Sequence, residues 1–135
     1  MKTIELMIGD WVMLNPDLKE YYDFAGNPCQ VIGLNDGEGA IKIDYDNGKY
    51  FWTDAEDDIE PILLTPEILE KNGFTRYGQV FANLQQWVGE FGDKRKSLFQ
   101  DVLTGEWEIN DVWIDYVHEL QHALKLCRID KELII

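Results

Sequence analysis

The chain has 135 residues, of which 45% are apolar and 13% aromatic, and its formal net charge is −14. This composition excludes wholesale disorder, collagen, coiled coils and disulfide scaffolds. No apolar run reaches the ~18 residues that a membrane-spanning helix needs. Residues 1–5 lack the apolar core of a signal peptide, so we expect an acidic cytoplasmic protein.

The negative charge is unevenly distributed along the chain. Residues 1–62 carry 14 acidic side chains against 4 basic ones, and residues 63–135 carry 12 against 8. Binding to nucleic acids requires cations that displace counterions from the phosphates, so we expect no direct contact with DNA or RNA. Two interpretations of the acidic surface stay open: it keeps the protein dispersed, or it imitates DNA and occupies a basic partner.

Residues 1–62 have the pattern of short strands joined by turns. Hydrophobic alternation and turn residues predict strands at 11–14, 29–34, 40–45, 49–53 and 59–64. Asn47 and Gly48 tolerate positive φ and form the strongest hairpin signal. The acidic residues 54–58 predict a loop. Short strands at this spacing predict an SH3-like antiparallel barrel.

A short helix over residues 66–72 is predicted to link the two halves of the chain. Thr65 is a good N-cap, and Pro66 suits the first helical position. Gly73 is placed for the left-handed residue that ends a helix. We therefore place a domain boundary after residue 62.

Residues 63–135 predict a second antiparallel sheet, covered by a long helix. Strands are expected at 77–82, 85–91, 96–103 and 131–135, and residues 106–109 are ambiguous. Asn110 or Asp111 can cap a helix over 111–128, because its apolar residues recur on one face. The predicted fold class is α+β. We expect the halves to pack as one unit, since neither alone buries much surface.

His118, Glu119 and His122 form the one motif that resembles catalytic chemistry. In an H-E-x-x-H helix the two histidines can share a zinc ion, while the glutamate activates the bound water. However, nothing in the sequence selects a third ligand. Both histidines also point away from the apolar stripe of the helix, toward solvent or a partner. The preferred prediction therefore assigns no catalytic residue, no metal and no cofactor, with a zinc hydrolase and adventitious surface metal binding as alternatives.

The two cysteines do not resemble a metal site or a disulfide framework. Cys29 and Cys127 are 98 positions apart, and no CxxC pair occurs. We expect both to be reduced thiols. Cys127 falls on the apolar face of the predicted helix, where a small buried residue is the ordinary interpretation.

The first half is rich in aromatic residues. Small barrels use surface aromatics to hold proline-rich peptides or methylated cations, and an acidic rim over residues 54–58 would suit a cationic ligand. Tyr21, Tyr22 and Phe24 lie in a loop and are the candidates for partner binding. The alternative is that most aromatic side chains fill the core or pack between the halves.

Four segments occur in a distinctive order: residues 8–12 (IGDWV), 59–69 (IEPILLTPEIL), 73–74 (GF) and 116–121 (YVHELQ). Over most of its length the chain resembles small uncharacterised proteins of gut Bacteroidetes and their phages or mobile elements. The first segment alone is similar to SH3-like or KOW-like barrels. The resemblance implies an intracellular bacterial or phage setting and no known activity.

These observations together predict a non-enzymatic protein-interaction module of the cytoplasm. Its protein partner is unidentified, no contact with membrane or nucleic acid is expected, and the oligomeric state is left open. The zinc hydrolase and the acidic DNA mimic are the alternatives, and each belongs to a different functional class.

Overall fold

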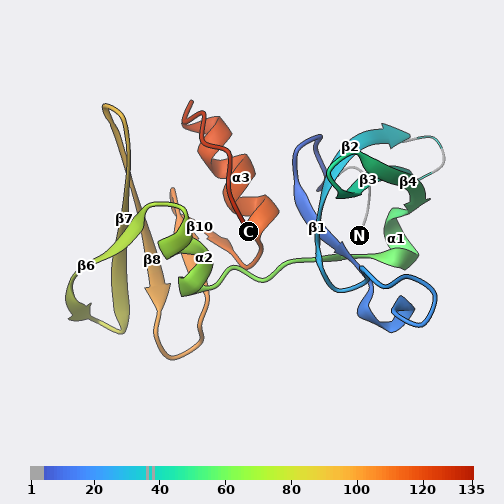
Figure 1. Cartoon of the computed structure of the whole chain (residues 1–135). Helices are drawn as coiled ribbons and strands as arrows, with labels where there is room; N and C mark the ends of the chain where they lie inside the picture. Colours follow the sequence, from blue (N-terminus) through green and yellow to red (C-terminus); the bar gives the residue numbers. More distant parts are fainter. Residues whose placement is uncertain (1–4, 36, 38) are drawn as a thin grey trace. The chain divides into compact units, whose positions relative to one another are not determined.

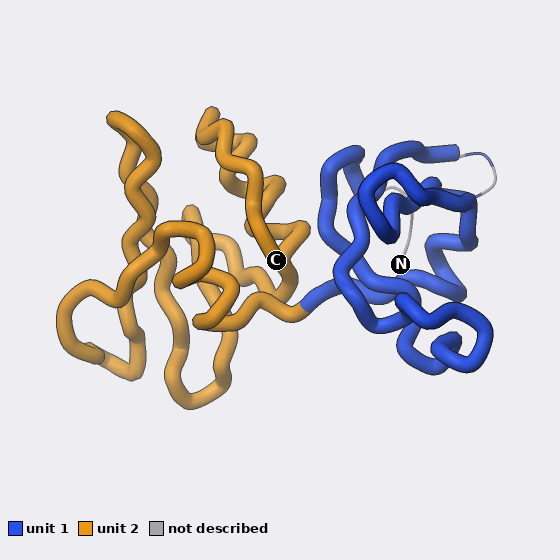
Figure 2. The backbone as a smooth tube through the Cα atoms, viewed as in Figure 1, with its two compact units in different colours: residues 1–62 blue, residues 63–135 orange. Residues whose placement is uncertain are grey.

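The computed structural model describes residues 5–35, 37 and 39–135. The protein is a mostly-β α+β protein with two five-stranded antiparallel sheets and a C-terminal helix (Figure 1). The chain divides into two compact units, residues 1–62 (the N-terminal unit) and residues 63–135 (the C-terminal unit; Figure 2). Within the described ranges, every helix is too short or too polar to cross a bilayer.

The N-terminal unit contains one sheet with the strand order β4-β3-β2-β1-β5. Its elements are β1 (Trp11–Leu14), the 3-10 turn η2 (Pro16–Leu18), β2 (Pro28–Asn35), β3 (Ala40–Asp46), β4 (Lys49–Asp54), α1 (Ala55–Asp58) and β5 (Ile59–Pro61). Strand β1 pairs with β2 on one side and with β5 on the other, so the last strand of the unit lies beside the first. In the described part of the chain, β4 and β5 form the two edges, and the sheet is open.

The hairpin between β3 and β4 forms where the sequence predicts it. Asn47 and Gly48 have φ values of 42° and 99°, the left-handed conformation that a tight hairpin turn requires. The Asp44 carboxylate accepts hydrogen bonds from the backbone N–H groups of Asp46 at 3.1 Å and Gly48 at 3.0 Å. The turn is therefore stabilised by a side chain from the strand that enters it.

The predicted loop at residues 54–58 is wrong, because Asp54 ends β4 and residues 55–58 form the helical turn α1. Asp54 caps this turn, and its carboxylate accepts the N–H groups of Glu56 at 2.8 Å and Asp57 at 3.1 Å. A carboxylate at this position satisfies two backbone donors and favours the helical conformation. The acidic sequence of residues 54–58, which is typical of a solvated loop, thus forms a capped helical turn.

The core of the N-terminal unit comes mainly from alternate positions of its strands, with Leu6, Ala25 and Ala55 added from outside them. The buried apolar residues are Leu6, Val12, Leu14, Ala25, Cys29, Val31, Ile41, Ile43, Ala55 and Ile59. Three aromatic residues, Phe24, Tyr45 and Phe51, are partly buried and pack against this core. Part of the aromatic content therefore fills space beside the core, as the alternative interpretation predicts.

The C-terminal unit is an up-and-down sheet with the order β10-β9-β8-β7-β6. Its elements are α2 (Pro66–Lys71), β6 (Phe74–Phe81), β7 (Leu84–Phe91), β8 (Lys94–Asp101), β9 (Trp107–Ile109), β10 (Val112–Ile114) and α3 (Val117–Leu126). The predicted helix signals are confirmed. Thr65 accepts the N–H of Ile68 at 3.3 Å, and Gly73 follows the helix with a φ of 85°.

The predicted helix over 111–128 is wrong in its first part. Asn110 and Asp111 have φ values of 55° and 62°, so they form a left-handed turn between β9 and β10 and cap no helix. Two consecutive residues with positive φ are the requirement of a tight β-hairpin, and asparagine and aspartate are the non-glycine residues that tolerate it best. The helix α3 begins only at Val117.

The predicted strand at residues 131–135 is also wrong, because a single side chain takes the place of strand pairing. The Asn72 side chain accepts the N–H of Ile134 at 2.6 Å and donates to its carbonyl at 2.7 Å. The same amide donates to the carbonyl of Ile68 at 2.8 Å. Asn72 is 1% exposed. The C-terminal segment is therefore held to α2 by a buried amide.

One face of the C-terminal sheet carries the core of the unit. Opposite residues of paired strands lie on the same face, and the buried residues on this face are Phe74, Trp87, Leu98, Trp107, Ile109 and Ile114. The rings of Trp87 and Trp107 meet edge to face at 5.9 Å, and the Trp107 indole N–H donates to the carbonyl of Leu64 at 3.1 Å. The other face carries mostly exposed or partly exposed side chains, and Val88, at 5% exposed, is buried on it.

Strand β6 is an edge strand with a break in its pairing. The register with β7 shifts between Tyr77 and Phe81, and Gly78 in this segment has a φ of 70°. The Gln85 side chain donates to the carbonyls of Tyr77 at 3.3 Å and Gly78 at 3.2 Å. A side chain thus satisfies the backbone acceptors that the bulge leaves unpaired.

Candidate functional site

The predicted partner-binding residues lie in the loop between η2 and β2. Tyr21 is 75% exposed and Tyr22 is 41% exposed, whereas Phe24 is partly buried against the core. The N–H of Gly26 donates to the carbonyl of Leu14 at 2.9 Å, which ties the end of the loop to β1. The loop therefore presents two tyrosines outward and is anchored by the phenylalanine.

Four rings from three segments, two from this loop and one each from β3 and β4, form an aromatic cluster. Phe24 stacks on Tyr45 with centroids 4.1 Å apart, and Tyr22 stacks on Phe51 at 5.4 Å. Phe51 also meets Phe24 and Tyr45 edge to face, at 5.6 Å and 5.9 Å. Such pairs add stabilisation beyond their buried area. The cluster joins the loop to β3 and β4, so Tyr22 is held in place.

An open depression of about 500 Å³ lies beside the exposed tyrosines. It is lined by Tyr21, Tyr22, Asp23, Phe24, Asn27, Tyr45 and Asp46, and is called here the tyrosine depression. Asp46 lies 3.5 Å from Lys49 in an exposed ion pair, which contributes little stability. The Asp23 carboxylate makes no hydrogen bond or ion pair with any described residue. Aromatic faces and carboxylates therefore converge on one surface.

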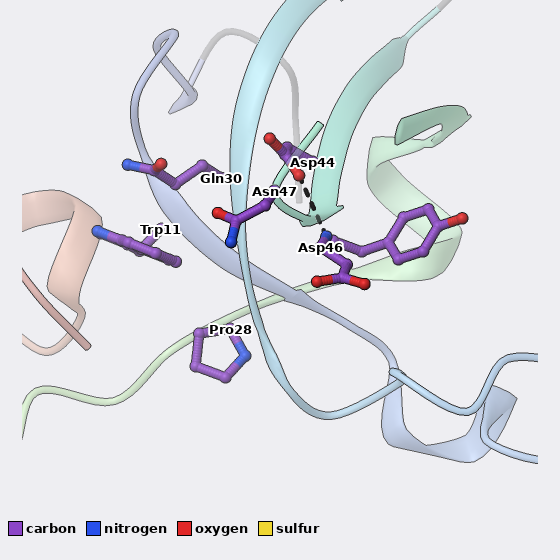
Figure 3. Close-up of a pocket in the computed structure, with 7 residues that line it drawn as sticks. Trp11, Pro28, Gln30, Asp44, Asp46 and Asn47 are labelled. Carbon is purple, nitrogen blue, oxygen red and sulfur yellow. Dashed lines mark hydrogen bonds between the residues drawn. The ribbon is translucent and has the colours of Figure 1, made fainter. Parts of the chain in front are cut away.

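A second depression of about 220 Å³ adjoins the first, and the two share Tyr45 and Asp46. Figure 3 shows its lining side chains, which are Trp11, Pro28, Gln30, Asp44, Tyr45, Asp46 and Asn47. The Trp11 indole, the Pro28 ring and the Gln30 amide come from the neighbouring strands β1 and β2, and the side chains of Asp44, Asp46 and Asn47 come from the β3–β4 hairpin. The two depressions form one continuous surface of the N-terminal unit.

The carboxylates on this surface are not those that the sequence suggests. The rim predicted over residues 54–58 lines neither depression, and Asp58 accepts a hydrogen bond from Thr53 at 2.9 Å. Asp23, Asp44 and Asp46 line them instead. The cause is the stacking of Phe24 on Tyr45, which brings the end of β3 beside the tyrosine loop. No local sequence signal reveals this long-range contact.

The two histidines of the H-E-x-x-H motif lie close together on α3. Their ring centroids are 5.6 Å apart at an interplanar angle of 75°. His118 is only 4% exposed, and its ring stacks on Tyr116 at 5.8 Å. The prediction that both histidines point toward solvent or a partner is therefore wrong for His118, whose ring is buried and has the tyrosine that precedes the helix on one side. His122 is partly exposed.

The glutamate of the motif caps the helix. The Glu119 carboxylate accepts the N–H groups of Asp115 at 3.0 Å and Tyr116 at 3.1 Å. This is the reciprocal half of a capping box, and it directs the carboxylate toward the backbone. Across the described residues, no three His, Cys, Asp or Glu side chains are placed to hold one metal ion. The geometry of α3 supports a structural role for Glu119.

The two cysteines are free thiols in different environments. Cys29 is in the core of the N-terminal unit, and burial raises the pKa of its thiol from 9.0 to about 11. Cys127 is partly exposed, follows α3, and receives a hydrogen bond from the Asn110 side chain at 3.2 Å. The prediction that Cys127 is buried on an apolar helix face is therefore wrong, since α3 ends before this residue.

The buried thiol makes the stability of the protein depend on alkaline pH. The unfolded thiol ionises from pH 9.0, whereas the folded thiol stays neutral until about pH 11. Its contribution to stability is therefore complete below pH 9.0 and is lost as the pH rises to about 11. Between pH 9.0 and about 11, the free energy of unfolding measured with urea should fall less with rising pH in Cys29→Ala than in the wild type. In Cys127→Ala the free energy of unfolding should fall with pH as it does in the wild type. The same fall in Cys29→Ala as in the wild type would contradict the attribution of this pH dependence to the Cys29 thiol.

The chain matches no protein-family model, no curated protein and no solved structure. The resemblance to small proteins of gut Bacteroidetes stays a prediction from the sequence. Among the described surfaces, the tyrosine depression is the one that contains all three residues predicted to bind a partner, Tyr21, Tyr22 and Phe24.

Proposed function

We propose that the protein is a non-enzymatic interaction module, and that its tyrosine depression binds a basic segment of a protein partner. The observation that carries the proposal is the convergence of Tyr21 and Tyr22 with Asp23 and Asp46 on one open surface. A cytoplasmic bacterial or phage setting, implied by the sequence resemblance, is part of the proposal. The zinc hydrolase is not proposed, because Glu119 caps α3.

The chemistry of the depression favours a cationic side chain. Lys and Arg groups are attracted to the face of an aromatic ring within about 6 Å, and nearby carboxylates add to that attraction. Residues 1–62 carry 14 acidic against 4 basic side chains, so the whole unit attracts basic partners. The neighbouring surface at Trp11 and Pro28 offers apolar contact for the residue next to the cation.

We further propose that the N-terminal unit is an SH3-like domain. Three features support this: the strand order β4-β3-β2-β1-β5, the long loop between β1 and β2, and the short helical turn before β5. SH3-like domains hold proline-rich peptides or methylated cations on surface aromatics. In this chain Tyr21 and Tyr22 occupy the long loop, where such a site is expected.

The proposal is tested with a fluorescently labelled peptide rich in lysine, arginine and proline, titrated with the full chain. Replacing both tyrosines (Tyr21→Ala with Tyr22→Ala) should weaken binding roughly tenfold or more, since exposed aromatic anchors dominate small interfaces. Fluorescence anisotropy measures the affinity. A matched peptide with glutamine in place of every basic residue should not bind.

Tyr50→Ala is the matched control for this experiment. Tyr50 is 54% exposed in the same unit and lies outside both depressions, with the Lys42 amine 3.7 Å from its ring centroid. Peptide affinity should be unchanged in this variant. Equal losses in the control and the double variant, or no loss in the double variant, would contradict the proposal.

Salt dependence separates this proposal from the DNA mimic. A mimic binds through its overall charge, so its affinity collapses with salt and does not depend on Tyr21 or Tyr22. Binding to the tyrosine depression should fall less steeply with salt, because part of the attraction comes from ring contacts. A steep salt dependence with no effect of the tyrosine variants would favour mimicry.

A further inference from the structure

A row of five side chains crosses the outer face of the C-terminal sheet, with one residue from each strand. Tyr77 pairs with Gln86, Gln86 with Phe99, Phe99 with Glu108, and Glu108 with Trp113. Because directly paired residues point to the same side of an antiparallel sheet, all five lie on one face. The core residues Phe74, Trp87, Leu98 and Trp107 occupy the opposite face, and Val88 is the buried residue on the face of the row among the described strand residues. This set is called here the cross-strand row.

The aromatic members of the row are accessible. Tyr77 is 55% exposed and Trp113 is 48% exposed, and Phe99 between them is partly exposed. The core of the unit does not need these rings, since the buried Trp87 and Trp107 fill it from the other side. Exposed rings at both ends and in the middle of a sheet face form a platform for stacking.

The spacing of the rings is regular. Aromatic side chains stand on every second strand, at β6, β8 and β10, and neighbouring strands are about 4.8 Å apart. The rings therefore recur at about 10 Å along the row. This spacing is close to the length of a disaccharide unit in an extended glycan. Each ring could then stack on the flat C–H face of every second sugar.

The positions between the rings carry groups that bind hydroxyls. The Gln86 amide donates to Ser97 at 3.1 Å, which orients it and leaves its oxygen as an acceptor. The Glu108 carboxylate makes no hydrogen bond or ion pair with any described residue. The Arg95 guanidinium lies 5.3 Å from the Tyr77 ring centroid and offers donors at one end of the row. Sugar hydroxyls are both donors and acceptors, so they suit this mixed set.

Two other ligands fit the cross-strand row less well. Rows of rings also stack the bases of single-stranded nucleic acids, but those sites add a basic groove for the phosphates. Here Glu108 lies within the row, and the chain has a net charge of −14. An apolar protein surface would bury Glu108 and Gln86 without compensation, which is costly.

We infer that the outer face of the C-terminal sheet binds a neutral, extended polysaccharide across its strands. The sheet twists from strand to strand, and rotation about glycosidic bonds allows such a chain to follow the twist. The site lies in the C-terminal unit and shares no residue with the tyrosine depression. The two proposals are therefore independent.

The test is native gel electrophoresis of the full chain with a soluble polysaccharide in the gel. The probes are hydroxyethyl cellulose, glucomannan and xylan as extended chains, and pullulan as a bent-chain control. At least one extended probe should retard the protein. Trp113→Ala and Tyr77→Ala should each weaken this retardation roughly tenfold, and Trp113→Phe should keep most of it.

Two control variants separate ring contacts from general surface effects. Phe81 is 83% exposed in the same unit but outside the row, so Phe81→Ala should be retarded like the wild type. Tyr21→Ala should also be retarded normally, even where it lowers affinity for the basic peptide. Urea unfolding shows whether each variant folds. If Trp113→Ala does not fold, the comparison of Trp113→Phe and Tyr77→Ala with the wild type still tests the inference.

Three results would overturn the inference. The first is no retardation by any extended probe, or retardation by pullulan alone. The second is an equal loss of retardation in Phe81→Ala and Trp113→Ala. The third is retardation by oligo(dT) that disappears with salt, which would assign the platform to single-stranded nucleic acid.

Discussion

Asn72→Ala is expected to lower the free energy of unfolding of the C-terminal unit by about 3 kcal/mol. The wild-type side chain makes three hydrogen bonds to backbone groups, two to Ile134 and one to Ile68. Each such bond contributes about 1 kcal/mol, and the loss of a buried amide also leaves a gap beside α2. Urea unfolding measures the loss. Limited proteolysis should show faster cleavage within residues 129–135.

Asn72→Asp separates hydrogen bonding from packing, because aspartate has nearly the same shape. Its carboxylate can still accept the N–H of Ile134, but it cannot donate, and it faces the carbonyls of Ile134 and Ile68. We expect this variant to be at least as unstable as Asn72→Ala at neutral pH, and to recover partly in acid, where the protonated group donates one bond. Wild-type stability at neutral pH would show that the donors of Asn72 do not matter.

Gly89→Ala is expected to destabilise the C-terminal unit by about 2–3 kcal/mol through overpacking. A Cβ atom at this position would lie 2.6 Å from Cε1 and 2.8 Å from Cδ1 of Phe74, and 2.8 Å from Cζ of Phe91. Phe74 is fully buried, and its ring meets that of Phe91 edge to face at 5.3 Å. The rings therefore close over the glycine, and one of them must move. Thermal or urea unfolding of the variant measures the cost.

A second-site change tests whether the clash is the cause. Phe91→Leu shortens the partly exposed ring that approaches Gly89, so Gly89→Ala with Phe91→Leu should be more stable than the sum of the single effects. The coupling between the two sites is read from a double-mutant cycle. Strict additivity, or a Gly89→Ala variant as stable as the wild type, would contradict the overpacking argument.

The parts of the fold that follow from local chemistry could be predicted from the sequence. The Asn47–Gly48 turn, the Thr65 cap and the end of α2 at Gly73 each depend on residues that are neighbours in the chain. Strands with alternating burial, such as β1 and β3, were predicted for the same reason. Two antiparallel sheets and a C-terminal helix follow from these elements.

The wrong secondary-structure predictions occur where one sequence pattern is compatible with two local conformations. Asn110 and Asp111 suit a helix cap and a left-handed turn equally well, and tertiary pairing of β9 with β10 selects the turn. The apolar residues 131–135 resemble a strand, but the Asn72 amide satisfies the backbone that a neighbouring strand would otherwise pair. A side chain that is distant in sequence cannot be inferred from a local pattern.

Some residues of the candidate sites could be identified from the sequence, and others could not. Tyr21 and Tyr22 could be identified because a loop rich in aromatic residues is unusual in sequence. Asp46 and Pro28 could not be identified in this way. Their positions beside the tyrosine loop depend on the pairing of strands and on the stacking of Phe24 on Tyr45. The cross-strand row could not be predicted, because the sequence pattern indicates a helix over 111–128 and so does not place Trp113 in the sheet.

The edges of the two sheets determine how this protein can aggregate. An exposed edge strand is a template on which another chain can add and begin cross-β growth. Strand β5 has three residues and ends in Pro61, β10 also has three, and the pairing of β6 is interrupted by its bulge. Among the described edge strands, β4 (Lys49–Asp54) therefore has the longest continuous run of pairing, from Tyr50 to Asp54. We therefore expect intermolecular strand addition to begin at that edge rather than at the other three.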